Sequence, residues 1–386
     1  MIYDFDTPVN RRNTDSVKWA VKENELPMWI ADMDFEVIPQ IKEAIKKRAD
    51  EAVYGYPVLP EEWYNAYISW WKRRHNFTIQ KDWLIFSTSV VAIVSSVVRK
   101  LTTPAENVLL QTPVYNIFFN SIVNNGRNVL ESPLRYENNI YSIDFERLEK
   151  DLSNPQTSMM ILCNPQNPTG NIWSKEELQK IGELCKKYGV TVISDEIHCD
   201  LTCPEKLYIP FASVSETCRD ISVNCVAPTK AFNIAGIMTA AAFVPNPVLR
   251  HKVWRALNTD EVAEPNIFAT ISAIEAFNNG DEWLDQLRKY VCENKKYVCE
   301  RIAKEIPHIK AHQSEATYLL WIDCSALKGD KKDLSDRLRE KTGLFVSAGH
   351  IYGKMGTDFL RMNLATSRKN VEDGVNRLIE AIKEME

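Results

Sequence analysis

Three polar side chains follow three apolar segments in the middle of the chain. Asn167 comes after the segment 158–164, Asp195 lies near the end of 189–196, and Lys230 comes after 221–227. Each segment is typical of a short buried strand, and ligands of open α/β sheets sit at the carboxyl ends of the strands. We therefore expect an amide, a carboxylate and an amine to meet at one edge of a sheet.

These three side-chain types match what pyridoxal 5′-phosphate (PLP) needs from a protein. A lysine holds the aldehyde as a Schiff base, a carboxylate keeps the pyridine nitrogen protonated, and a donor binds the phenolate oxygen. Each residue alone has an ordinary alternative. The segment 164–170 (NPQNPTG) is typical of a tight loop, Asp195 could cap a helix, and Lys230 could be a solvated lysine. Together they predict a PLP site that breaks bonds at the α-carbon of an amino acid.

Alternating helix and strand patterns surround these residues. Strands are expected at 107–111, 158–164, 189–196, 221–227 and 238–244. Helices are expected near 60–75, from about residue 88, and from Ser174, which forms a capping box with Glu177, to about residue 189. The alternation predicts an α/β fold with a mostly parallel sheet between helices.

The last third of the chain has a different pattern. Helices are expected at 247–258, 265–279, 281–305, 331–342 and after Asn370, and strands at 317–323 and 359–365. The pattern predicts a connecting helix and a smaller α+β domain. We expect an N-terminal segment (1–45) that joins the small domain, a large PLP-binding domain (46–280) and a small C-terminal domain (281–386).

Composition limits the partners of this chain of 386 residues. The 47 basic and 52 acidic residues give a net charge of −5, which predicts no nucleic-acid partner. No segment approaches the roughly 18 uncharged apolar residues of a membrane-spanning helix, and the N-terminus lacks an apolar signal core. We expect a cytoplasmic protein without membrane contact.

The nine cysteines are odd in number and scattered along the chain. Cys199 and Cys203 with His198 come nearest to a zinc motif, but a second ligand pair at similar spacing is missing. The sequence therefore favours reduced thiols and predicts no metal.

Three motifs carry a resemblance to a known superfamily. NPQNPTG (164–170), SDEIHCD (194–200) and TKAFNIAG (229–236) occur in the order found in fold-type-I PLP enzymes, the aspartate aminotransferase superfamily. More narrowly, the chain resembles the cystathionine β-lyase (C–S lyase) subgroup often called MalY/PatB. The segments that resemble this subgroup are LPMWIADMDF (26–35), VYGYP (53–57), TPVYNIFF (112–119), SDEIHCDL (194–201), TKAFNIAG (229–236), EATYLLWID (315–323) and FLRMNLATSR (359–368).

The resemblance implies the PLP fold type I, with a seven-stranded type of sheet, and a homodimer with shared active sites. It also implies roles for residues around the ring. Lys230 would hold PLP and move the α-proton, Asp195 would pair with the pyridinium nitrogen, and Asn167 would bind the phenolate oxygen. Tyr115 would stack on the ring, although core packing is its ordinary alternative, and His198 would support the ring from behind.

The resemblance further implies a phosphate site at the start of the helix near residue 88, where free amides and the helix dipole favour an anion. Ser89 and Val90 would supply amides, Thr229 would supply a hydroxyl, and Tyr56 would reach the phosphate of the partner subunit. The chain departs from the family at two positions. Ser89 stands where the family usually has Gly, and Ala227 stands where it usually has Ser. We expect weaker PLP retention.

For the substrate, the resemblance implies that Arg361 binds the carboxylate as a two-point fork, with the backbone near Ala31 closing over it. A structural salt bridge is the ordinary alternative for Arg361. The implied reaction is β-elimination, which cleaves cystathionine or a related cysteine S-conjugate to a thiol, pyruvate and ammonia. The residues alone do not separate elimination from transamination, because both begin by breaking the Cα–H bond. An aminotransferase and a degenerate regulatory homologue remain as alternatives.

Overall fold

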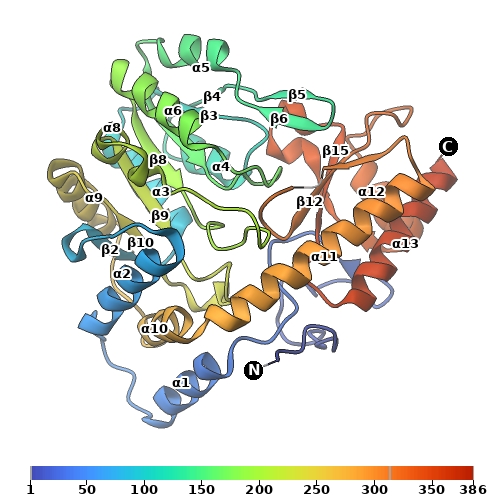
Figure 1. Cartoon of the computed structure of the whole chain (residues 1–386), viewed down its shortest axis with the longest axis horizontal. Coiled ribbons are helices and arrows are strands. Elements are labelled where there is room, and N and C mark those ends of the chain that lie inside the picture. Colours follow the sequence, from blue (N-terminus) through green and yellow to red (C-terminus); the bar gives the residue numbers. More distant parts are fainter. Residues whose placement is uncertain (1, 313, 386) are drawn as a thin grey trace.

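A seven-stranded sheet forms the centre of the larger part of the molecule in the computed structural model, which describes residues 2–312 and 314–385 (Figure 1). β10 is antiparallel to both of its neighbours, and all other neighbouring pairs are parallel. The expectation of a mostly parallel sheet is therefore confirmed. The spatial order is β2 (Leu84–Ser87), β10 (Ala240–Phe243), β9 (Ser222–Val226), β8 (Thr191–Asp195), β7 (Thr157–Cys163), β3 (Asn107–Leu110) and β4 (Asn128–Glu131).

The register aligns the carboxyl ends of the central strands. Cys163 of β7 lies opposite Asp195 of β8, and Asp195 lies opposite Cys225 of β9. From β3 the chain proceeds to one side of the sheet, to β4, and from β7 it proceeds to the other side, through β8 and β9. The sheet thus has a topological switch point between β3 and β7, where open α/β sheets bind ligands.

Both faces of this sheet are covered, which explains why β7 is apolar throughout. Met159 and Ile161 pack in one hydrophobic cluster, while Met160 and Leu162 pack in another. Parallel strands buried on both faces have continuous apolar sequences. The first cluster includes α3 (Val90–Leu101), α4 (Ile117–Val123) and α9 (Pro247–Thr259), and the second includes α5 (Phe145–Leu152), α6 (Lys175–Lys187), α7 (Phe211–Val214) and α8 (Glu216–Asp220).

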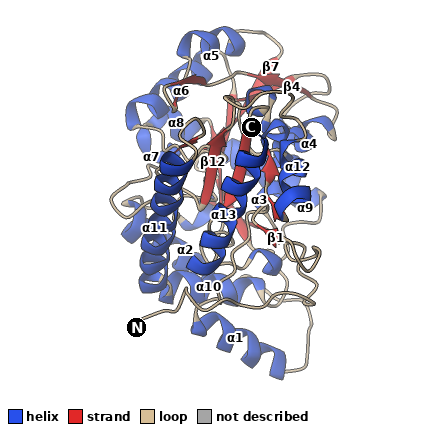
Figure 2. Ribbon diagram, turned by 90° about the vertical axis from the view of Figure 1, so that its right-hand side faces the viewer, coloured by secondary structure: helices blue, strands red, loops and turns tan. Residues whose placement is uncertain are grey.

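A smaller, antiparallel sheet lies in the C-terminal part of the chain. Its order is β11 (Lys310–His312), β12 (Leu319–Asp323), β15 (Phe359–Asn363) and β14 (Ser347–Ala348). The long helix α11 (Asp281–Glu305) runs beside it, together with α12 (Leu334–Thr342) and α13 (Arg368–Met385) (Figures 1 and 2). β1 (Leu26–Pro27) pairs in parallel with β13 (Leu344–Phe345), so the N-terminal segment packs on the C-terminal part.

The local signals in the sequence explain several helix ends. Ser174 and Glu177 form the expected capping box at α6. The helix expected from residue 265 begins later, at α10 (Ala269–Asn279), because the Asn266 side chain accepts hydrogen bonds from the Phe268 and Ala269 amides, at 3.0 and 3.1 Å. An aromatic cluster around Trp63, Trp70 and Trp71 of α2 (Glu61–His75) joins that helix to α10. The remaining α-helix is α1 (Pro39–Asp50), and β5 (Arg135–Glu137) and β6 (Ile140–Ser142) form a hairpin.

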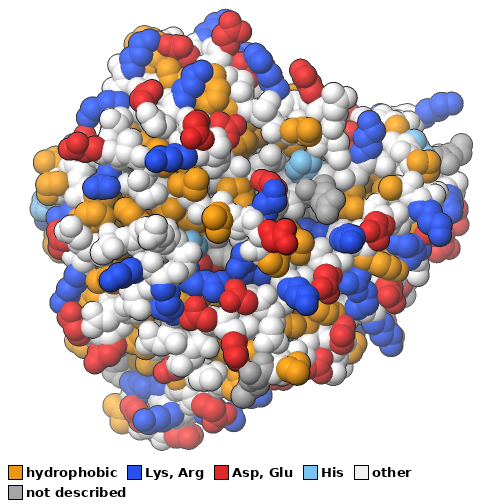
Figure 3. All heavy atoms as spheres, in the orientation of Figure 1, with side chains coloured by type: hydrophobic (Ala, Val, Ile, Leu, Met, Phe, Trp, Pro, Cys, Tyr) orange, Lys and Arg blue, Asp and Glu red, His pale blue; other side chains and the backbone are white. Residues whose placement is uncertain are grey.

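Acidic and basic side chains are interspersed over the face shown in Figure 3. Within residues 2–312 and 314–385, the helices are too short or too polar to cross a membrane.

Candidate active site

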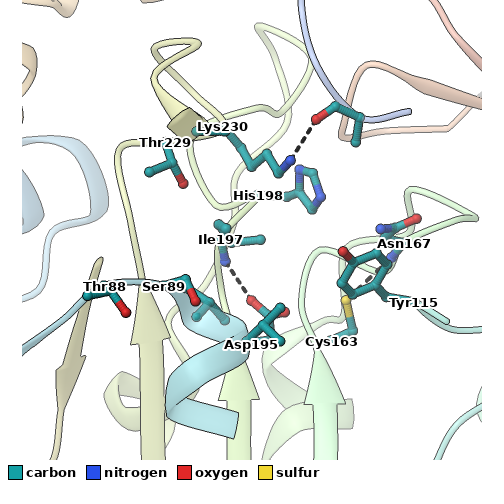
Figure 4. Close-up of a pocket in the computed structure, with 14 residues that line it drawn as sticks. Thr88, Ser89, Tyr115, Cys163, Asn167, Asp195, Ile197, His198, Thr229 and Lys230 are labelled. Atoms are coloured by element: carbon teal, nitrogen blue, oxygen red, sulfur yellow. Dashed lines mark hydrogen bonds between the residues drawn. The ribbon is translucent and has the colours of Figure 1, made fainter. Parts of the chain in front are cut away.

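A cavity of about 180 Å³ lies at the carboxyl ends of β7, β8 and β9 (Figure 4). The structure brings nine of the residues that the sequence singled out to its wall. Two of the other expected residues lie elsewhere: Arg361 stands beside the cavity, and Tyr56 is 99% exposed in the segment before α2. The nine residues are Ala31, Ser89, Val90, Tyr115, Asn167, Asp195, His198, Thr229 and Lys230.

Asp195 is the last residue of β8, and its carboxylate is buried without a basic partner at ion-pair distance among the described residues. Its Oδ1 atom accepts a hydrogen bond from the Ile197 amide at 3.0 Å. Burial raises the pKa of Asp195 to about 7, and the Ile197 amide and the Lys230 charge oppose this rise only in part. A cationic N–H group in the cavity would compensate this carboxylate, which fits a protonated pyridine ring.

Lys230 lies in the loop after β9, and its Nζ atom donates a hydrogen bond to the carbonyl oxygen of Ala31 at 2.6 Å. Burial lowers the pKa of Lys230 to about 8; the nearby Asp32 carboxylate opposes this, and the Arg361 charge adds to it. A lysine with a lowered pKa has a larger neutral fraction, which is the nucleophilic form that attacks an aldehyde.

The backbone on both sides of Ala31 is held in place by the side chains of Asn363 and Asn233. Asn363 Nδ2 donates to the carbonyls of Ile30 and Asp32, each at 2.7 Å. Asn233 Nδ2 donates to the carbonyl of Phe35 at 2.8 Å. The N-terminal segment is thus fixed against the loop that carries Lys230.

Arg361 of β15 is a buried cation without a carboxylate partner at ion-pair distance among the described residues. One terminal nitrogen donates to Asn167 Oδ1 at 3.1 Å and the other to the carbonyl of Trp29 at 2.9 Å, while Nε has no partner. The Tyr352 ring lies 4.8 Å from the guanidinium carbon. A buried guanidinium with unused donors is suited to a carboxylate ligand, and within the described part of the chain Arg361 forms no structural salt bridge.

The same contact orients Asn167. Because its Oδ1 atom accepts from Arg361, its Nδ2 atom is left to donate, as a phenolate ligand requires. The loop also places the Asn167 amide against the Cys163 sulfur, at 3.4 Å.

Two neutral rings face the cavity. Burial lowers the pKa of His198 to about 3, with the Lys230 and Arg361 charges adding to the effect, and its Nδ1 atom has no partner. Burial raises the pKa of Tyr115 to about 12, so the phenol keeps its proton at neutral pH. Both residues therefore offer uncharged ring faces to a planar ligand.

The start of α3 forms the opposite end of the cavity. Ser89 caps the helix, since its Oγ atom accepts from the Ala92 amide at 3.1 Å. The first amides of a helix lack partners within the helix, which leaves those of Val90 and Val91 for an anion. Thr229 lines this cavity as expected, whereas Ala227 lies in the apolar core and is not part of the wall.

Sequence reasoning missed several residues of the site. Thr88, Val91, Cys163, Ile197 and Ala235 also line the cavity, and all except Ala235 lie within four residues of a position that was singled out. Their proximity to strand ends and to the helix start could have indicated them. The Trp29 carbonyl and the Tyr352 ring have no such signal, because only the folded chain brings them to Arg361.

Cys199 and Cys203, which with His198 came nearest to a zinc motif in the sequence, have different neighbours in the structure. Cys199 is buried near His75 and Asp200, and His75 Nε2 contacts Asp200 Oδ1 directly at 2.9 Å. Cys203 lies beside Cys292 of α11 instead.

Comparison with known proteins agrees with this fold and site. The family model "aminotransferase class I and II" matches residues 24–378, and the chain belongs to this family. It is 38% identical over 386 residues to the cystathionine β-lyase PatB of Bacillus subtilis, covering 98% of this chain and 100% of the relative. It is 32% identical to the protein MalY of Escherichia coli, with 99% of each chain covered.

A solved structure gives a similar result. The PLP-bound C–S lyase of Staphylococcus hominis superposes with a TM-score of 0.92 at 29% identity, covering 99% of this chain and 98% of that one. The superfamily and the MalY/PatB subgroup that the motifs resembled are thereby confirmed.

Proposed function

We propose that this chain is a PLP-dependent C–S β-lyase that cleaves cystathionine or a related cysteine S-conjugate to a thiol, pyruvate and ammonia. The observation that carries the proposal is the single cavity at which Lys230, Asp195 and Asn167 converge, with the unpaired Arg361 beside it. Relatives named as a cystathionine β-lyase and a PLP-bound C–S lyase support elimination over transamination.

The residues present fit PLP at every part of the molecule. Lys230 would hold its aldehyde, Asp195 its pyridine nitrogen and Asn167 its phenolate oxygen. Tyr115 and His198 would flank the ring. The α3 amides, with the Thr229 hydroxyl, would hold the phosphate. When bound, PLP supplies a ring that withdraws electrons from the substrate and so eases proton removal at Cα.

The protein's own groups bind the substrate and move its proton. Arg361 offers its free Nε–H and the second hydrogen of the terminal nitrogen that contacts Asn167 to the substrate carboxylate. Lys230, once released, takes the proton from Cα, and its lowered pKa suits an amine that must be neutral to act as a base. The backbone near Ala31, whose carbonyl accepts from Lys230 Nζ at 2.6 Å, would close over the substrate carboxylate.

The proposal includes a homodimer in which Tyr56 reaches the phosphate of the partner subunit. Its support is the near-complete exposure of Tyr56 within a segment that also exposes Val53, Tyr54 and Val58, an unusual run of apolar side chains for a monomer. We also propose a cytoplasmic location for the protein. The chain would divide into an N-terminal segment (1–45), a large domain (46–280) and a small domain (281–386). The pairing of β1 with β13 supports the assignment of the first segment to the small domain.

The reaction is tested by supplying purified enzyme and PLP with cystathionine, and separately with an amino acid plus 2-oxoglutarate. We expect pyruvate and ammonia from cystathionine, released together with a free thiol. Glutamate formation in the second assay, without pyruvate in the first, would establish an aminotransferase instead. Absence of both activities, with no yellow colour after PLP addition, would identify a regulatory homologue.

A further inference from the structure

Two partly exposed cysteines from distant parts of the sequence share one surface groove. Cys203 lies in the segment that follows β8, and Cys292 lies on α11. Both line the same groove, where each sulfur acts on the other, and Arg288 of α11 also donates to the carbonyl of Cys203. The backbone amide of Cys203 donates to the carbonyl of Glu315 at 2.7 Å, which fixes its position.

Two cations of α11 lie on the same helix face as Cys292, at the positions four residues before and three residues after it. Arg288 Nε donates to the carbonyl of Thr202 at 2.8 Å, and a terminal nitrogen donates to that of Cys203 at 3.3 Å. Lys295 is fully buried; its Nζ atom donates to Ser314 Oγ at 2.9 Å and to the carbonyl of Ala316 at 2.6 Å. No carboxylate of a described residue forms an ion pair with Lys295; burial lowers its pKa, and the nearby Cys203, Cys292 and Cys299 sulfurs oppose this effect.

The two sulfurs differ in their protonation. The neighbouring Cys292 thiol, with the charges of Lys295 and Arg288, lowers the pKa of Cys203, while burial and the Glu315 carboxylate oppose this effect. The Cys203 sulfur and burial raise the pKa of Cys292. The pair therefore favours a thiolate on Cys203 and keeps the proton on Cys292. The other charged groups of the groove are Glu205, Lys206, Lys289, Glu293, Glu315 and Lys296.

We propose that Cys203 and Cys292 form a redox-modification site that takes hydroperoxides and closes to a disulfide. The Cys203 thiolate attacks a peroxide oxygen, the O–O bond breaks, and the leaving oxygen takes a proton from solvent. Cys203 becomes a sulfenic acid. The Cys292 sulfur then loses its proton and attacks the Cys203 sulfur, the S–O bond breaks, and the second oxygen leaves as water. Two thiols and one hydrogen peroxide thus give one disulfide and two waters.

The site does not depend on the proposed lyase reaction, but its position links it to the cavity. Cys203 belongs to the segment that carries Asp195 and His198, and the Leu201 carbonyl in this segment accepts from the Thr317 amide at 2.7 Å. A disulfide to α11 would tie this segment to the long helix and close a large loop. Cross-links that close large loops stabilise the native state, so the oxidised protein should unfold at a higher temperature.

The test treats the full-length, PLP-loaded protein with one equivalent of hydrogen peroxide, blocks free thiols with N-ethylmaleimide and maps peptides without reduction. We expect a cross-linked pair of peptides that contains Cys203 and Cys292 and is lighter than the two peptides by two hydrogen masses. Dithiothreitol should separate the two peptides again. In untreated protein at pH 7, Cys203 should be alkylated at least tenfold faster than Cys299, a third cysteine of comparable exposure on α11.

Two variants separate the steps. Cys292→Ser should stop at the sulfenic acid, which dimedone traps on Cys203, and Cys203→Ser should leave Cys292 unmodified. Cys299→Ser is the matched control and should form the disulfide as the native chain does. Alkylation of Cys203 no faster than that of Cys299, or peroxide oxidation that leaves both thiols free, would overturn the proposal, and neither result requires a variant to fold.

Discussion

The two ends of the cavity bind by different means. At the reactive end, Lys230, Asp195, Asn167 and Arg361 would act through side chains whose chemistry few other residues could replace. At the phosphate end, the ligand would be held mainly by backbone amides at the start of α3, with one hydroxyl from Thr229. Substitutions should therefore be costly at the reactive end and mild at the phosphate end, which is where this chain departs from its family.

The difference is also visible in how each end is stabilised. At the reactive end, burial raises the pKa of Asp195 and lowers that of Lys230, because the apolar surroundings penalise the charged forms. The phosphate end instead uses the dipole and free amides that any helix start offers, and Ser89 caps that helix without removing them. Buried ionisable groups with shifted pKa values are thus concentrated at the reactive end, as expected for a site in which a ligand compensates their charges.

The largest expected effect comes from Lys230→Ala. The variant should lose pyruvate release from cystathionine by a factor of about 10³ or more, because both the attachment of PLP and the proton transfer need the amine. The measurement is pyruvate formation under saturating PLP. Lys295→Ala, at a buried lysine outside the cavity, is the comparison, and an equal loss in both variants would contradict a special role for Lys230.

The next effect concerns pH and stability. Asp195 has a folded-state pKa raised from 3.8 to about 7, so its stabilising contribution is full below pH 4 and is lost as the pH rises through 7. Asp195→Asn removes this penalty, about 4 kcal/mol in the free energy of unfolding of the PLP-free protein at neutral pH.

Urea unfolding from pH 4 to pH 8 measures this difference. The advantage of the variant over the native chain should grow between pH 4 and pH 7 and then level off. Burial also raises the pKa of Glu196 to about 7, so the Glu196→Gln variant is measured in the same way and its pH dependence is compared with that of Asp195→Asn. A difference that does not vary with pH would show that Asp195 is not the group that titrates.

Arg361→Lys should raise the KM for cystathionine about 10-fold to 100-fold, because an ammonium group replaces a two-point fork in a buried site. The yellow PLP absorbance should remain, since Arg361 does not hold the cofactor. Arg339→Lys is the matched control, because Arg339 has its own carboxylate partner in Glu25 at 2.8 Å. An unchanged KM would show that the substrate carboxylate binds elsewhere.

The smallest effect tests the phosphate end. Ala227→Ser restores the hydroxyl that the family usually has, and it should slow PLP loss during dialysis by about threefold to tenfold, the value of one hydrogen bond. Ser89→Gly restores the other family residue and should change PLP retention by less than about twofold, since glycine also permits a helix cap. A loss of PLP binding in Ala227→Ser would instead indicate that the tightly packed core around Ala227 has no room for the hydroxyl.

The site residues that directly follow strands could be predicted from the sequence. The contacts between residues far apart in the chain could not. Asn167, Asp195 and Lys230 each follow an apolar strand, so the rule that ligands bind at strand ends is enough to predict that they meet. Ser89 and Val90 were predicted from the family resemblance, which places the phosphate at a helix start. In contrast, Trp29 and Tyr352 contact Arg361 only through the packing of β1 on β13 and of β15 on its neighbours.

The pair of Cys203 and Cys292 also could not be predicted from the sequence. The sequence grouped Cys203 with Cys199 because they are close in the chain, whereas the structure places it beside a cysteine of α11. Short-range spacing indicates motifs, but long-range packing decides which side chains meet. The proposed role of Tyr56 cannot be tested even by the fold of one chain, because it depends on a second subunit.

The proposed function requires Lys230 to be the lysine that holds PLP. Borohydride reduction of the PLP-loaded protein, followed by peptide mapping, attaches the cofactor permanently to whichever amine holds it. We expect the pyridoxyl phosphate mass on the peptide that contains Lys230, in about one equivalent per chain. Label on another buried lysine, such as Lys18 or Lys295, with Lys230 unmodified, would contradict it.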